Sequence, residues 1–220
     1  MRINKITFTG ADNNTNPNRL KEIQNKYPHV EWGILVSSNN NRNRYPCEEY
    51  ILGLKDMGLN LSLHLCGKYS RSIMQDDDIT LKYDWFDRYQ INFNFKNNAH
   101  DLNNFYKLAN KYPDKKFILQ SNQSNDYYID EILKNDISNV NVLYDASGGR
   151  GTEIKNISYP YKNVYTGYSG GINLDNIWTV CEAITSCDDD SEVWIDMESG
   201  VRTNDEFDLD KVKRILETEY

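Results

Sequence analysis

Residues 163–173 read NVYTGYSGGIN, and residues 192–201 read EVWIDMESGV. In each stretch, a short run of β-branched and aromatic residues, typical of a strand, leads directly into a turn that contains glycine. Similar apolar runs recur along the chain at intervals of about 20 to 30 residues, and segments with helical spacing lie between most of them. This alternation predicts βαβ units and a parallel sheet.

The pattern predicts eight strands and six helices. The strands are expected at Lys5–Thr9, Trp32–Ser37, Leu59–Cys66, Tyr89–Phe95, Lys116–Ser121, Asn141–Asp145, Asn163–Gly167 and Glu192–Met197. The helices are expected at Arg19–Lys26, Glu48–Met57, Asn103–Tyr112, Tyr127–Lys134, Asn176–Thr185 and Leu209–Glu219. The segment after the third strand is short, and Gly148–Tyr159 after the sixth has turn chemistry and little helical character.

The placement of glycine separates the two ways of arranging such a sheet. An open, doubly wound sheet usually carries a glycine-rich turn after its first strand. Here the first strand ends in residues 9–13, TGADN, and the glycine-rich segments follow strands six, seven and eight instead. A barrel with a phosphate site in its late loops has that distribution, and it typically needs roughly 200 to 250 residues. We therefore predict a single α/β domain over residues 1–220, folded as a (β/α)₈ TIM barrel.

Composition excludes several classes of protein. The formal net charge is −8 and the basic residues are scattered among acids, which argues against a nucleic-acid binder. No apolar stretch approaches the roughly 18 residues of a membrane span, and the first residues do not resemble a signal peptide. The four cysteines form no C-x-x-C pair, as expected of free thiols in a cytoplasmic protein. The three histidines have no metal-ligand spacing, so we expect neither a metal nor another cofactor. Nothing in the sequence predicts an oligomeric state.

Three glycine loops on adjacent strands predict an anion site. They contain Gly148-Gly149 after strand six, Gly170-Gly171 after strand seven and Ser199-Gly200 after strand eight. Glycine lets the backbone approach a ligand and turn its N–H groups toward it, which forms a nest for an anion. We therefore expect a small phosphorylated ligand at the carboxyl ends of the late strands, where barrels place their active sites.

Five short segments resemble the phosphoribosylanthranilate isomerases of tryptophan biosynthesis. Residues 145–151, DASGGRG, are similar to their strand-six segment, and residues 168–177, YSGGINLDNI, to their strand-seven segment. Residues 196–201, DMESGV, are close to their Asp-x-x-Ser-Gly-Val. Residues 61–64, LSLH, and Arg44-Tyr45 resemble their strand-three motif and strand-two loop. The matches fall in order and span nearly the whole chain.

This resemblance implies an Amadori rearrangement of an aminoaldose phosphate to an aminoketose phosphate. A general acid protonates the ring oxygen and a general base removes the C2 proton. The resemblance places the acid at Asp145 and places Arg44 on the substrate carboxylate, where a guanidinium fork suits two oxygens. We also expect His64 and Gln120, at the ends of strands three and five, to contact the ligand.

The first strand departs from the family pattern. The family base is a cysteine in a Lys-Ile-Cys-Gly motif, whereas this chain reads KITFTGAD over residues 5–12 and offers Thr7 or Thr9 at that position. A threonine hydroxyl is a poor base near neutral pH, so Asp12 is the candidate replacement. Two hypotheses stay open: an isomerase acting on a phosphoribosyl-type ligand, and a binding protein that sequesters or senses a phosphorylated, nucleotide-like metabolite.

Overall fold

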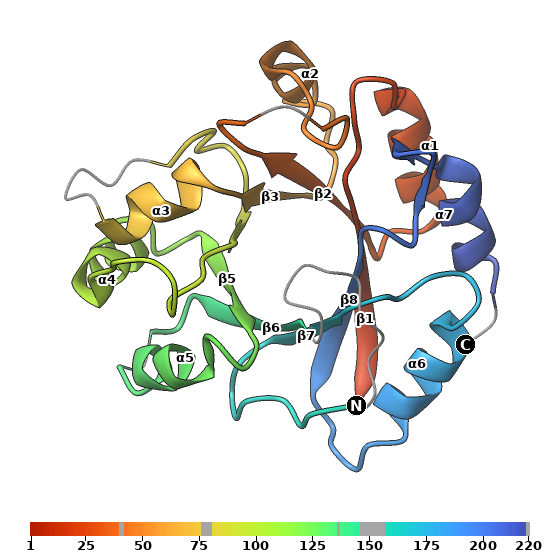
Figure 1. Ribbon diagram of the computed structural model, residues 1–220. Helices are drawn as coiled ribbons and strands as arrows, with labels where there is room; N and C mark the ends of the chain where they lie inside the picture. Colours follow the sequence, from red (N-terminus) through yellow and green to blue (C-terminus); the bar gives the residue numbers. More distant parts are fainter. Residues whose placement is uncertain (40–41, 76–80, 136, 146–156, 219–220) are drawn as a thin grey trace.

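The computed structural model describes residues 1–39, 42–75, 81–135, 137–145 and 157–218. Eight parallel strands form a closed barrel in chain order, so the predicted TIM-barrel fold is confirmed (Figure 1). The last strand pairs with the first, with Ile6 opposite Ile195. The strands are β1 (Arg2–Thr9), β2 (Val30–Val36), β3 (Leu61–Leu65), β4 (Arg88–Ile91), β5 (Lys116–Ser121), β6 (Val140–Asp145), β7 (Thr166–Ser169) and β8 (Glu192–Met197).

In the part of the chain that the structure describes, seven helices lie around the outside of the strand ring (Figure 1). They are α1 (Pro17–Lys26), α2 (Glu48–Gly53), α3 (Lys68–Gln75), α4 (Leu102–Lys111), α5 (Asp126–Leu133), α6 (Ile177–Thr185) and α7 (Leu209–Leu216). Local capping explains several starts: the side chains of Asn16, Asp101 and Asp208 accept hydrogen bonds from the first backbone N–H groups of α1, α4 and α7. Within the described residues, no helix combines the length and the apolar character that crossing a membrane requires.

Several elements differ from the sequence-based prediction. The segment after β3 contains α3, which buries Ile73 and Met74 against the barrel. Helix α2 ends at Gly53, earlier than the predicted end at Met57, and Gly58 follows with a φ of 62°. After β8 the chain forms a two-stranded hairpin of β9 (Arg202–Thr203) and β10 (Glu206–Phe207), which the sequence pattern did not predict.

The barrel interior is filled by side chains from alternate strand positions. Trp194 of β8 is fully buried there and packs with Ile118 and Leu143. Gly167 makes room for it, because a Cβ atom at this position would lie 2.2 Å from the indole ring. The interior also holds a buried ion pair between Glu31 and Arg88.

Candidate functional site

A polar cavity of about 990 Å³ opens at the carboxyl ends of the strands. Residues from every strand after the first, or from the loop that follows it, line this cavity. In barrel enzymes the active site lies at this end of the strands. The cavity volume is in the range of small-molecule sites, roughly 300 to 1,000 Å³. The lining includes His64, Cys66, Gln90, Gln120, Asp145, Ser169, Asp196 and Glu198.

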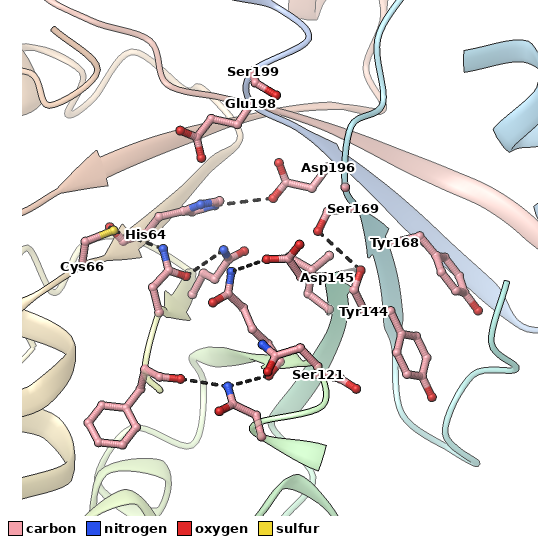
Figure 2. Close-up of a pocket in the computed structure, with 18 of the residues that line it drawn as sticks. His64, Cys66, Ser121, Tyr144, Asp145, Tyr168, Ser169, Asp196, Glu198 and Ser199 are labelled. Atoms are coloured by element: carbon pink, nitrogen blue, oxygen red, sulfur yellow. Dashed lines mark hydrogen bonds and ion pairs between the residues drawn. The ribbon is translucent and has the colours of Figure 1, made fainter. Parts of the chain in front are cut away.

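Two aspartates face this cavity from β6 and β8. Asp145 is opposite Ser169 in the β6–β7 ladder, and Ser169 is opposite Asp196 in the β7–β8 ladder, so the two carboxyls flank one serine. Both aspartates are buried, and both carboxyl groups point into the cavity (Figure 2). The arrangement therefore brings together two groups that can give or take a proton.

Asp196 holds its proton at neutral pH. Burial raises the pKa of its carboxyl from 3.8 to about 8, and the nearby carboxylates of Glu198 and Glu31 contribute in the same direction. The hydroxyl of Thr9 donates a hydrogen bond of 2.7 Å to its Oδ1, which lowers the pKa without offsetting the burial. A carboxylic acid that stays protonated near pH 7 is the form that a general acid requires.

His64 lies beside this acid as a neutral imidazole. Its ring faces the carboxyl group of Asp196 (Figure 2), and the distance from Nε2 to Oδ2 is 4.0 Å. Within the described residues, Nε2 has no hydrogen-bond partner. Burial lowers the pKa of His64 to about 3, so the ring stays uncharged at neutral pH. The predicted ligand contact at His64 thus reaches the cavity as a neutral hydrogen-bonding group.

Asp12 is not among the residues that line the cavity. Its Oδ2 accepts hydrogen bonds from Arg202 at 3.1 Å and from the backbone N–H of Phe207 at 2.9 Å. Its Oδ1 accepts from the hydroxyl of Thr15 at 3.0 Å. The structure therefore brings Asp12 together with the β9–β10 hairpin, not with Asp145, and its contacts are those of a residue that joins two loops.

Arg44 reaches the cavity wall and is paired with protein carboxylates. Its guanidinium forms an ion pair with Glu198 and a second, at 3.5 Å, with Asp205. Burial raises the pKa of Glu198, and Arg44 opposes that shift. The group expected to bind a substrate carboxylate thus already has two carboxylate partners.

The loops after β7 and β8 meet at the rim of the cavity. Gly170 and Gly171 have φ angles of 121° and 60°, which a residue with a side chain rarely adopts, and both line the cavity together with Ser199. At Gly200 a Cβ atom would lie 2.0 Å from the carbonyl oxygen of Ile172, so glycine permits the close contact of the two loops. Gly148 and Gly149, the predicted third loop, lie outside the described residues.

Gln120, the other predicted contact, and Cys66 also line the cavity. The Nε2 of Gln120 donates a hydrogen bond of 3.4 Å to Oδ2 of Asp145, which links strands β5 and β6 inside the cavity. Burial raises the pKa of the Cys66 thiol to about 11, so this thiol is protonated at neutral pH and is no base. In the part of the chain that the structure describes, no three His, Cys, Asp or Glu side chains are grouped so as to hold a metal ion.

Asp196 is the site residue that the sequence-based assignment of roles missed. The sequence did show a carboxylate between two apolar residues of β8, Ile195 and Met197, which both belong to the main hydrophobic core. The raised pKa depends on neighbours such as Thr9, which is 187 positions away in sequence. No sequence pattern shows that contact.

The fold and the site define a TIM-barrel protein with an acid-lined cavity at the carboxyl ends of its strands. No protein-family model matches the chain. A search of curated proteins found no match either.

Proposed function

We propose that this barrel binds a small phosphorylated, phosphoribosyl-type ligand and catalyses an aldose–ketose isomerisation by the ring-opening and C2-deprotonation steps that an Amadori rearrangement also uses. The observation that supports the proposal most strongly is the pair of cavity aspartates, one of which is protonated at neutral pH. Asp145 lies on β6 and Asp196 on β8, and Ser169 of β7 lies between them. A substrate lying over Ser169 would have a carboxyl group on each side.

The two aspartates divide the proton transfers between them. Asp196, as the protonated partner, would protonate the ring oxygen and open the sugar. Asp145 would accept the C2 proton, with Gln120 holding its carboxyl in place. This assignment gives the base role, which the resemblance placed on the first strand, to an aspartate on β6. A positioned acid or base contributes roughly 10²- to 10⁴-fold to the rate.

The phosphate of the ligand would bind at the rim where the loops after β7 and β8 meet. Gly170, Gly171 and Ser199 present backbone to the cavity there, and the left-handed φ angles at the two glycines are typical of anion nests. Arg42 also lines the cavity and supplies positive charge. The proton on Asp196 lowers the negative charge that an incoming phosphate would meet.

Two measurements on D-ribose 5-phosphate test this proposal. Calorimetry measures binding, and NMR in D₂O measures exchange of the C2 proton, which an aldose–ketose isomerase must remove. We expect the wild type to bind the sugar phosphate and to accelerate exchange. Asp145→Asn and Asp196→Asn should retain binding and lose exchange by about 10²-fold or more. Equal exchange rates in both variants and the wild type would exclude the assigned roles.

A second candidate is a binding protein that sequesters or senses such a ligand. The observation in its favour is the threonine pair on β1, where Thr7 donates to Glu31 and Thr9 to Asp196, so neither hydroxyl can act as the base. In the same experiment, this candidate predicts binding of ribose 5-phosphate with C2 exchange no faster than in buffer. Absence of binding would exclude both candidates.

A further inference from the structure

We propose that the β3–β5 side of the cavity binds the uncharged, polyhydroxylated part of the ligand, so that the substrate is a sugar phosphate without a second acidic group. This inference rests on the proposed function and specifies its substrate class. The surface in question consists of Gln90, Asn92, Gln120 and His64, which we call the amide floor.

Two buried polar atoms of the amide floor lack partners. Oε1 of Gln90 and Nε2 of His64 have no hydrogen-bond partner within the described residues, and the two side chains are only 4% and 2% exposed. They are opposite each other in the β3–β4 ladder, and both line the cavity. Leaving a buried polar atom unpaired is costly, so a ligand that supplies the missing hydrogen bonds would be bound selectively.

The remaining hydrogen bonds hold the amide floor in one orientation. Nε2 of Gln90 donates to Oδ1 of Asn92 at 2.9 Å, which leaves Oε1 of Gln90 as the free acceptor. Nδ2 of Asn92 in turn contacts the sulfur of Cys66 at 3.1 Å. The preorganised free acceptor calls for a hydroxyl or N–H donor on the ligand.

The charges around the cavity argue against a ligand that carries a carboxylate in addition to its phosphate. The members of the amide floor are uncharged, since His64 is neutral, and Arg44 is already paired with Glu198 and Asp205. A carboxylate placed near Arg44 would also meet Glu198 and Asp145, which both line the cavity. Neutral hydroxyls avoid that repulsion and satisfy the free acceptors, because each hydroxyl can both donate and accept.

Calorimetry with three probes tests this inference. We expect D-ribose 5-phosphate to bind about 10-fold or more tightly than inorganic phosphate, whereas 2-carboxyphenyl phosphate, which carries an aromatic carboxylate, should bind no more tightly than inorganic phosphate. Gln90→Leu should lower the affinity for ribose 5-phosphate about 10-fold, which is the effect of one lost hydrogen bond. The affinity for inorganic phosphate should stay unchanged. Gln75→Leu, on the exposed face of α3, is the matched control.

Stability separates a binding role from a structural one. Gln90→Leu removes one hydrogen bond, from Nε2 to the partly exposed Asn92, and relieves the unpaired Oε1, so its Tm should stay within about 2–4 °C of the wild-type value. Tighter binding of 2-carboxyphenyl phosphate than of ribose 5-phosphate would overturn the inference. An equal loss of affinity for ribose 5-phosphate and for inorganic phosphate in Gln90→Leu would overturn it as well.

A fourth titration distinguishes this inference from the phosphate site. If inorganic phosphate and ribose 5-phosphate both fail to bind, D-ribitol is titrated alone. Binding of ribitol that Gln90→Leu abolishes would support the amide floor while the proposed phosphate site fails. Absence of ribitol binding as well would overturn the inference.

Discussion

Asp196 shows how far a single residue depends on the tertiary structure around it. Burial among β-strand neighbours and the carboxylates of Glu198 and Glu31 raise its pKa, and Thr9 at the other end of the chain orients it. The residue type could be read from the sequence. Its protonation state follows from contacts that only the closed barrel creates.

The raised pKa makes stability depend on pH. The unfolded chain releases the Asp196 proton near its ordinary pKa of 3.8, whereas the folded chain retains it until about pH 8. Between these values the folded state binds one more proton, so the contribution of Asp196 to stability is full below about pH 4 and is lost as the pH rises to 8. Asp196→Asn removes this dependence.

Urea unfolding at pH 5 and pH 8 measures the effect. We expect the free energy of unfolding of Asp196→Asn to rise relative to that of the wild type between pH 5 and pH 8, by about 1 kcal/mol or more. A difference between variant and wild type that is the same at both pH values would show that Asp196 has an ordinary pKa.

Asp12 has a structural role, because its carboxylate forms a buried ion pair with Arg202 at 3.1 Å. Its partner Arg202 has a side chain that is only 5% exposed, and Asp12→Ala would leave that charge buried. We expect a loss of about 3–5 kcal/mol in the free energy of unfolding. Asp205→Ala is the matched control, since this half-exposed partner of Arg202 should contribute about 0–1 kcal/mol. Equal losses in the two variants would contradict the structural role of Asp12.

At the scale of elements, Gly167 on β7 and Trp194 on β8 are a matched pair. The Cβ of Gly167→Ala would lie 2.2 Å from the indole ring, so the ring or the strand must move, at a cost of about 1–3 kcal/mol. Gly53→Ala is the control: nothing lies within 4 Å of its Cβ, and alanine in helix α2 should stabilise by about 0.5–1 kcal/mol. Thermal unfolding that shifted both variants in the same direction would contradict this packing.

Elements with strong apolar patterns were predictable, and those fixed by distant contacts were not. Strand β5 was predicted at its observed bounds. Helix α3 was missed because its sequence, KYSRSIMQ, is mostly polar and only its tertiary contacts bury Ile73 and Met74. The β9–β10 hairpin was missed because Arg202 is held by Asp12 and Gly10, about 190 positions away. Strand β4 was predicted to reach Phe95 but ends at Ile91, since Phe95 stacks on Tyr128 instead.

At the scale of the whole molecule, the closed barrel was predictable because the repeated strand–helix pattern predicts a parallel sheet and the glycine-rich segments follow its last strands and not its first. The candidate site was predictable in part: His64, Gln120, Asp145 and the loops after β7 and β8 all reach one cavity. The pairing of Asp145 with Asp196, and the removal of Asp12 from the site, depend on how the barrel closes. Ring closure brings β8 beside β1, and no local pattern along the chain specifies which of their polar side chains meet.

A crystal structure of the protein soaked with D-ribose 5-phosphate tests the proposed ligand site most directly. We expect a phosphate bound to the backbone N–H groups of Gly170, Gly171 and Ser199, with the sugar extending between Asp145 and Asp196. An empty cavity at saturating ligand, or a phosphate bound away from these loops, would contradict the proposed site.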